Sequence, residues 1–324
     1  MAPYIMTCMM DADLPQCSGL DRDTLRRLAR RSDARGLLQL ALHAATLAVT
    51  GLLVSLSRGR LWLVPAMILY GVVLNFSFCA LHETIHRTAF ASRRLNDAVA
   101  WITGAVMILP PEYFRAFHFA HHRFTQDPAR DPELAQPPPA TLSSYLWRIT
   151  GIPNWTKRLS VTLKHAVTGR IAEPFVAEAK RAAVVREARV LWACYAAILA
   201  FSLVARTPVA LFYWVLPLLL GQPVLRLYLL AEHTGCPLVE DMYANTRTIY
   251  TNAAVRFLAW QMPYHFEHHA FPAVPFHALA EVNARVRDRI VNGAAGYLAV
   301  HAGLIRELRG ARAGAHPQAR RETV

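Results

Sequence analysis

Three short histidine clusters are the residues of this sequence best suited to chemistry. They read HETIH at positions 82–86, HFAHH at 118–122 and HFEHH at 265–269, and one more histidine ends a long apolar run at position 233. His82 and His86 are four residues apart, so on a continuing helix both rings lie on one face and can bind one metal ion. We therefore predict nine metal ligands: His82, His86, His118, His121, His122, His233, His265, His268 and His269.

The number of imidazoles distinguishes between kinds of metal site. HExxH is also the zinc-protease signature, with Glu83 as the general base, but one zinc ion takes about four ligands. Nine histidines fit two ions better, which leaves an intramembrane zinc protease as a remote alternative. Imidazole suits iron, copper, nickel and zinc, so the spacing does not choose the element. Isolated histidines are excluded from the site: His43, His165, His277, His301 and His316.

Hydropathy indicates the elements that must position these clusters. The mean hydropathy of +0.22 and several long apolar runs predict an all-α protein embedded in a lipid bilayer. A short run, Ala98 to Pro110, is expected to be interfacial or re-entrant, and Tyr145 to Arg170 to form interfacial helices. Four runs are expected to cross the membrane: Leu37 to Ser57, Leu61 to Ala80, Val190 to Ala205 and Pro208 to Leu230.

The placement of arginines predicts the orientation of these spans. In a membrane protein the net charge of +13 is better explained by topology than by nucleic-acid binding. Arginines gather before the first span, whereas the two expected outside loops contain only Arg58, Arg60 and Arg206. Both termini should be cytoplasmic, and His233 and all three clusters then form a cytoplasmic histidine-rich helical cap. A metal transporter would instead place its ligands along a path near mid-bilayer.

The rest of the chain is divided by composition. Residues 1–36 are expected to form a cytoplasmic N-terminal segment, residues 37–308 the membrane domain, and the Arg-, Ala- and Gly-rich residues 309–324 a disordered tail. The five cysteines are scattered and form no paired metal spacing, so we assign them no chemistry.

The clusters, their order and the four-span layout resemble the integral-membrane fatty acid desaturases and their hydroxylase relatives, whose histidine boxes read HxxxH, HxxHH and HxxHH. The resemblance covers roughly residues 40–290 and includes the sequences HHRFTQDPARDPEL and HHAFPAVPFHAL that follow the second and third boxes. It implies two iron ions that use O2 and two electrons to oxidise an unactivated C–H bond. No HPGG haem motif is present, so electrons should come from a separate ferredoxin or free cytochrome b5, attracted by the arginine-rich cytoplasmic face.

Other polar residues are candidates for supporting the site. Among the nearby carboxylates, which include Asp127, Asp131 and Asp241, we expect Glu83, Glu232 and Glu267 to orient the ligating rings. We expect Asn75, Gln222 and Arg226 to line the substrate pocket, because they lie on helix faces that lead to ligands. An acyl lipid, acyl-CoA or acyl-carrier substrate is the first expectation. A desaturase or hydroxylase of a small polar metabolite, such as an amino acid derivative, is the alternative suggested by Arg226. The sequence does not distinguish a ketolase from these desaturase and hydroxylase functions.

Overall fold

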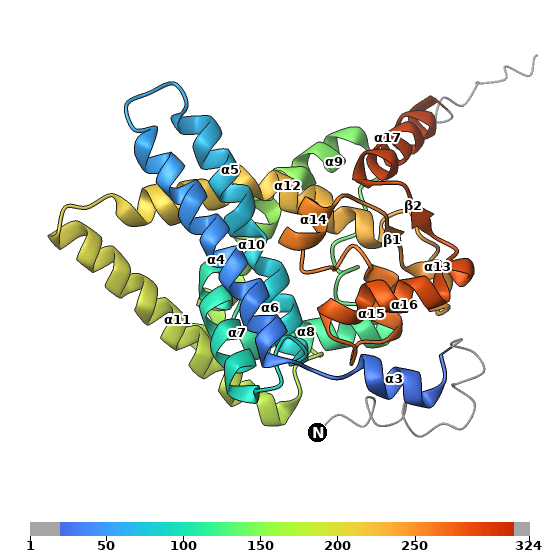
Figure 1. Cartoon of the computed structure of the whole chain (residues 1–324). Helices are drawn as coiled ribbons and strands as arrows, with labels where there is room; N and C mark the ends of the chain where they lie inside the picture. Colours follow the sequence, from blue (N-terminus) through green and yellow to red (C-terminus); the bar gives the residue numbers. More distant parts are fainter. Residues whose placement is uncertain (1–19, 314–324) are drawn as a thin grey trace, which may run out of the picture.

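Four long helices dominate the structure, a computed structural model that describes residues 20–313 (Figure 1). They are α4 (Asp33–Leu56), the continuous pair α5 (Leu63–Asn75) and α6 (Ser77–His86), α11 (Glu178–Val204), and η1 (Leu211–Val215) with α12 (Leu216–His233). Each is long and apolar enough to cross a bilayer. The prediction of an all-α protein with four transmembrane helices is confirmed. Its two strands in the described range, β1 (Thr248–Ile249) and β2 (Gly293–Ala294), form one short parallel pair.

Three helix boundaries differ from the hydropathy prediction. The second long helix continues past Ala80 to His86, which brings the whole first histidine cluster onto its last turns. α11 begins at Glu178 rather than Val190, because its first turns carry charged residues that hydropathy does not count as span. Most of the run expected to be interfacial or re-entrant, Ala98 to Pro110, lies in an amphipathic helix, α7 (Arg93–Met107), which begins five residues before the run. Helical hydrogen bonding thus extends beyond the apolar runs, into segments that carry charged residues or histidines.

Two glycines let the second and fourth spans approach closely. A Cβ on Gly71 would lie 2.1 Å from the carbonyl oxygen of Pro217, and one on Gly221 would lie 2.1 Å from the carbonyl carbon of Gly71. Small residues are used in this way where membrane helices pack backbone to backbone. Beside this contact, Nδ2 of Asn75 donates to the carbonyl oxygens of Gly71 (2.7 Å) and Leu218 (3.0 Å). Asn75, predicted to line the pocket, holds the two spans together instead.

Shorter helices complete the fold around the ends of α6 and α12. A long connection carries α8 (Pro111–Phe124), α9 (Leu142–Ile149) and α10 (Ile152–Thr168), which confirms that residues 145–170 are mostly helical. We call α8 together with α13 (Met242–Asn245), α14 (Ala253–Leu258), α15 (His265–Ala270) and α16 (Leu279–Val286) the cap. The remaining elements are α3 (Arg22–Leu28), η2 (Phe276–Ala278), η3 (Arg287–Arg289) and α17 (Tyr297–Ala313).

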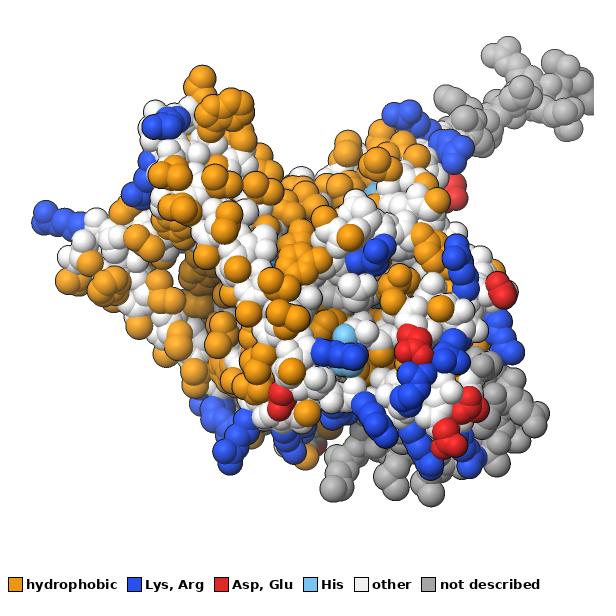
Figure 2. Space-filling model, viewed as in Figure 1, with side chains coloured by type: hydrophobic (Ala, Val, Ile, Leu, Met, Phe, Trp, Pro, Cys, Tyr) orange, Lys and Arg blue, Asp and Glu red, His pale blue; other side chains and the backbone are white. Residues whose placement is uncertain are grey.

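The surface separates into an apolar and a charged part. Figure 2 shows hydrophobic side chains over the projecting α4, α5 and α11, while many charged side chains gather over the cap and the ends of the spans next to it. Exposed apolar residues on α4 and α11 include Leu38, Val49, Leu199 and Phe201. Lipid contact explains such exposure along helices of this length. α17 continues to Ala313, into the segment expected to be a tail, and residues 314–324 lie outside the described range.

Candidate metal centre

The predicted ligands come from four helices that converge at one end of the spans. His82 and His86 lie on the last turns of α6, and His233 is the last residue of α12. The second cluster forms the C-terminal half of α8, and the third cluster forms most of α15. His82, His118, His265 and His268 are each at most 4% exposed. Segments far apart in the sequence therefore meet in one buried site.

The nine histidines divide into two groups. Within each group one ring nitrogen of every member lies within 4.8 Å of those of the other members. We call the first the five-histidine group, made of His82, His86, His118, His122 and His268. The second is the four-histidine group, made of His121, His233, His265 and His269.

Helix periodicity explains why each HxxHH sequence serves both groups. On α8, His118 and His122 are one turn apart and belong to the five-histidine group, while His121 points to the other group. On α15 the assignment is reversed, because His265 and His269 are one turn apart in the four-histidine group. His268, on the same helix, belongs to the five-histidine group. Two short helices can therefore bridge two adjacent metal positions.

Distances between ring nitrogens suit shared metal ions. The Nε2 atoms of His118 and His122 are 2.9 Å apart, and Nε2 of His233 lies 3.2 Å from that of His121 and 3.0 Å from that of His265. Two nitrogens bound to one ion at about 2.0–2.1 Å lie about 3 Å apart when they subtend a right angle at the metal. All three close pairs fall within a group and none crosses between them.

The electrostatic state of the rings also fits metal binding. Burial, and secondarily the neighbouring imidazoles, lower the pKa values of His118, His122, His265, His268 and His269 well below the usual value. These rings are therefore neutral at pH 7 and present a lone pair, which is the form that binds metal. Both nitrogens of His268 are buried without a hydrogen-bond partner, as is Nε2 of His269. A metal ion would satisfy such nitrogens.

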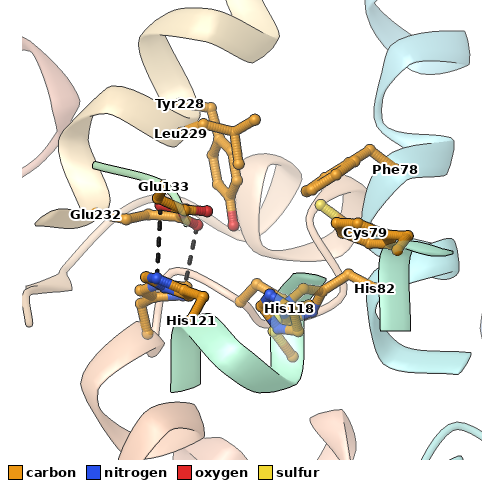
Figure 3. A pocket seen from close by; sticks show the side chains of 12 residues that line it. Phe78, Cys79, His82, His118, His121, Glu133, Tyr228, Leu229 and Glu232 are labelled. Atoms are coloured by element: carbon orange, nitrogen blue, oxygen red, sulfur yellow. Dashed lines mark ion pairs between the residues drawn. The ribbon is translucent and has the colours of Figure 1, made fainter. Parts of the chain in front are cut away.

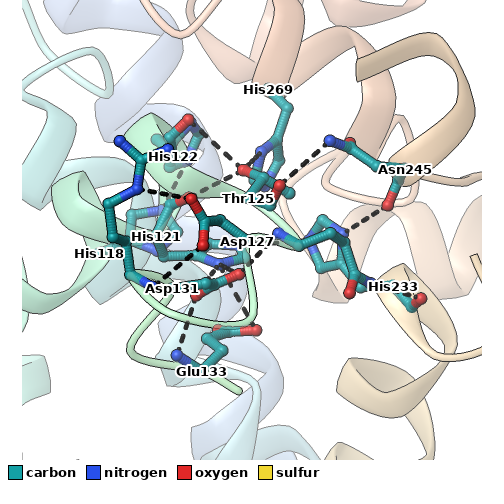
Figure 4. A network of polar contacts seen from close by, with 12 residues as sticks. His118, His121, His122, Thr125, Asp127, Asp131, Glu133, His233, Asn245 and His269 are labelled. Carbon is teal, nitrogen blue, oxygen red and sulfur yellow. Dashed lines mark hydrogen bonds and ion pairs between the residues drawn. The ribbon is translucent and has the colours of Figure 1, made fainter. Parts of the chain in front are cut away.

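Three rings of the four-histidine group are oriented through their Nδ1 atoms (Figure 4). Nδ1 of His121 lies 3.0 and 3.1 Å from the two carboxylate oxygens of Asp131. Nδ1 of His233 lies 3.2 Å from the carbonyl oxygen of Asn245, and Nδ1 of His269 lies 3.2 Å from the hydroxyl of Thr125. Such contacts leave Nε2 free for a metal ion and fix the ring plane.

Asp131 is the main carboxylate partner of a cluster ring, although sequence reasoning had favoured three glutamates. Burial alone would lower the pKa of His121, but the charge of Glu133 and the hydrogen bond with Asp131 raise it above its usual value. The backbone N–H groups of Gln126 and Glu133 also donate to Asp131, each at 2.9 Å. Only its position, in a turn ten residues after His121, could have indicated from the sequence that Asp131 contacts this ring.

The three predicted glutamates have different partners. Oε1 of Glu232 lies 3.5 Å from Nδ1 of His265, so this residue does face a cluster ring. Glu83 accepts a hydrogen bond from the backbone N–H of Phe276 at 3.0 Å. Glu267 accepts from Thr248 (2.7 Å) and Asn283 (2.5 Å). In the described part of the chain, Glu83 therefore joins α6 to η2 and Glu267 joins α15 to β1 and α16, and neither hydrogen-bonds to a cluster ring.

A small cavity of about 20 Å³ adjoins both histidine groups (Figure 3). This volume holds about one water-sized group. Glu133 and Glu232 lie on one side of the cavity and Phe78 on the other. The histidines in its wall are His82, His118, His121 and His265, and the remaining residues are Cys79, Phe114, Tyr228, Leu229 and Met262.

None of the three predicted pocket residues forms part of this cavity wall. Gln222 is fully buried, and its Cγ lies 2.1 Å from where a Cβ of Gly151 would be, at the start of α10. Arg226 donates from Nη1 to Oδ1 of Asn154 at 3.3 Å. Both predictions overlooked α10, because sequence alone did not indicate that it packs across α12.

Comparison with known proteins gives consistent matches. The model of the family described as fatty acid desaturase matches residues 59–300, which is more than half of the chain. Dihydrorhizobitoxine desaturase of Bradyrhizobium elkanii is 26% identical over 235 residues, covering 66% of this chain and 65% of that protein. Sphingolipid delta(4)-desaturase DES1 of Drosophila melanogaster is 27% identical over 235 residues, covering 70% of this chain and 67% of that protein. The matched region thus spans just under two thirds of the length of the first relative.

Proposed function

Because this chain belongs to the fatty acid desaturase family, we propose that it is a membrane-bound, O2-dependent di-iron desaturase. The observation that carries the proposal is the division of nine histidines, seven of them buried, into groups of five and four. The net reaction removes two hydrogens from adjacent carbons. With O2, two electrons and two protons, it yields one C=C bond and two molecules of water.

The two histidine groups would each hold one iron ion, and together these ions would supply the O2-activating redox chemistry. The protein's own residues then have two tasks. Asp131, Asn245 and Thr125 keep ring nitrogens directed at the ions. Phe78, Phe114 and Met262 supply apolar parts of the cavity wall and would limit the access of water to the reacting carbons.

Electrons would reach the site from a separate protein, either a ferredoxin or free cytochrome b5. An acidic donor fits the arginine-rich N-terminal region, where Arg22, Arg26 and Arg30 precede the first span. Both termini and the site would be cytoplasmic, as the arginine distribution predicts. A reporter fused after Val324 should accordingly be active in the cytoplasm, and activity on the opposite side would contradict this topology.

An acyl lipid, acyl-CoA or acyl-carrier group is the first substrate class that we propose, and a small polar metabolite is the alternative. The alternative is supported by the two carboxylates, Glu133 and Glu232, that form part of the cavity wall beside the histidines. The names of the relatives include both dihydrorhizobitoxine and a sphingolipid as substrates, so the matches are compatible with either class.

Metal and product analysis of one variant tests the proposal. Purified wild-type protein should contain about two irons per chain, and cells that express it should accumulate a new unsaturated product. His268→Ala should lose iron and product without loss of helix content, because His268 is buried between neighbouring rings. His277→Ala is the matched control, since His277 contacts Arg35 outside both groups. One zinc ion, no iron and peptidase activity would favour the zinc-protease alternative instead.

A further inference from the structure

A basic groove lies outside the metal centre, between the C-terminal end of α10 and the N-terminal part of α11. It encloses about 500 Å³, a volume within the usual range of about 300–1,000 Å³ for ligand pockets. Its lining includes three arginines, Arg181, Arg186 and Arg189, and also Gly169, Val185 and Val190. Among the residues that the structure describes, no acidic side chain lines it. The size and composition of the groove suit an anion that is attached to apolar groups.

Arg189 joins the two helices that form the groove. Its Nε donates at 3.0 Å to the carbonyl oxygen of Ala166, in the last turn of α10, where carbonyl groups lack a helical partner. A Cβ on Gly169 would lie 3.3 Å from Nη2 of Arg189, so the absence of a side chain there leaves space for the guanidinium group. Arg181, Val185 and Arg189 follow one another at intervals of four residues and therefore share one face of α11. Helix packing thus fixes one arginine in the groove, and the helix repeat aligns a second with it.

The positive charge of the groove is only partly compensated by neighbouring acids. Arg181 pairs through Nη1 with the exposed Glu178 at 2.7 Å, but its Nε is buried without a hydrogen-bond partner. In the described range, no ion pair within 4.0 Å involves Arg186 or Arg189. Glu187, next to Arg186 in sequence, is buried and accepts from a backbone N–H in the first turn of α8 at 2.8 Å. The groove therefore offers uncompensated positive charge and an unused donor to a ligand.

The groove lies where the charged turns of α11 meet its apolar run. Val190 begins that run and is 45% exposed, and Val167, in the last turn of α10, is 73% exposed. Figure 2 shows basic side chains at the lower end of α11, below the hydrophobic side chains of its span. In a bilayer, phospholipid head groups meet their acyl chains at such a boundary, and arginines there reach the head groups. A lipid at this level would meet the arginines with its head group and the valines with its chains.

We propose that this groove binds an anionic phospholipid, with the lipid phosphate between Arg181, Arg186 and Arg189 and the acyl chains against Val185 and Val190. The planar guanidinium group can donate two parallel hydrogen bonds to phosphate oxygens. Basic pockets at the membrane surface bind anionic head groups. The bound lipid would join α10 to α11 and so stabilise the folded protein. The groove shares no residue with the two histidine groups, so the inference does not depend on the desaturase proposal.

The test measures binding of three probes to the full-length protein in a non-ionic detergent by titration calorimetry. Dioctanoyl phosphatidylglycerol carries a net negative charge. Dioctanoyl phosphatidylcholine carries the same phosphate and chains without a net charge, and glycerol phosphate lacks the chains. Phosphatidylglycerol should bind at least about tenfold more tightly than either of the others, because only this probe combines a net negative charge with apolar chains. Its addition should also raise the unfolding temperature.

Substitutions distinguish a specific site from a general attraction of anionic lipid to a basic protein. Arg186→Gln should weaken phosphatidylglycerol binding about ten- to hundredfold, as expected for the loss of hydrogen bonds to a charged group. A basic side chain that only attracts an anionic surface contributes about fivefold. Arg206→Gln is the matched control, because it removes an exposed arginine just beyond the opposite end of α11, and it should weaken binding by no more than that. Arg181→Lys keeps the charge but loses the planar fork, so its affinity should lie between those of the wild type and Arg181→Gln.

Each variant should match the wild type in iron content and in unfolding temperature without added lipid, which shows that the fold is retained. Equal binding of phosphatidylglycerol and phosphatidylcholine would overturn the inference, as would equal losses in Arg186→Gln and Arg206→Gln. Glycerol phosphate that binds as tightly as phosphatidylglycerol would assign the groove to a soluble anion and would overturn the inference as well.

Discussion

Replacing Asp131 with asparagine should remove one of the two iron ions. The carboxylate is 2% exposed, and its oxygens lie 3.0 and 3.1 Å from Nδ1 of His121. Asp131→Asn keeps the size of the side chain but replaces one acceptor oxygen by an NH2 donor. The ring can no longer be held as a donor at Nδ1 by an ionised group, so its Nε2 is less well prepared for a metal ion.

The size of the effect follows from the lost hydrogen bond. A hydrogen bond to a charged group contributes about 1.5–3 kcal/mol, and loss of such a partner typically lowers metal affinity about 10- to 100-fold. Only the four-histidine group should be affected, because His121 belongs to it and not to the other. Although burial opposes it, the hydrogen bond with His121 lowers the pKa of Asp131 below 3.8. The carboxylate is thus ionised throughout about pH 6–8, and the deficit should be constant across that range.

Iron content after dialysis against a moderate chelator measures this loss. Wild-type protein should retain about two irons per chain and Asp131→Asn about one. Asp127→Asn is the matched control in the same turn, since Asp127 contacts the backbone of Ala129 and the side chain of Arg130 instead of a ring. Retention of both ions, or equal loss of both, would show that Asp131 does not act through His121.

Two further variants test how the fold holds the site. Gly221→Val should lower the unfolding temperature and the iron content together, because its side chain would overlap the backbone of Gly71 and separate the spans that carry His82 and His233; Gly303→Ala, with open space around it, should change neither. Glu267→Gln should destabilise the folded state by about 1–3 kcal/mol, measured by thermal unfolding, because the buried hydrogen bonds from Thr248 and Asn283 would lose their charged acceptor. An unchanged melting temperature would contradict the second expectation.

Hydropathy was sufficient to predict the four spans, and the spacing of the histidines was sufficient to select residues that converge in the structure. Long apolar runs have one interpretation in a bilayer, and three clusters with i,i+4 spacing have few structural explanations. The division into five and four histidines could not be predicted, because it depends on how α8 and α15 are rotated relative to each other. That rotation decides whether His121 or His122 faces a given neighbour.

The sequence pattern could not predict the contacts that loops make or which helices cross each other. Asp131 reaches His121 only because the turn after α8 folds back on the helix, and several nearby carboxylates looked equivalent to it. Asn75 and Gln222 were assigned to a pocket from their helix faces, but those faces pack against Leu218 and Gly151. Helix-face reasoning identifies what a residue can point toward. It does not identify which neighbouring element occupies that space.

Two segments carry both a part of the metal site and a charged residue of the cavity wall. On the turn after α8, Asp131 contacts a histidine while Glu133, two residues later, lines the cavity. On α12, Glu232 lines the cavity and directly precedes His233, which belongs to the four-histidine group. Because each segment serves both purposes, a substitution that shifts either backbone should change the iron content and the cavity wall together.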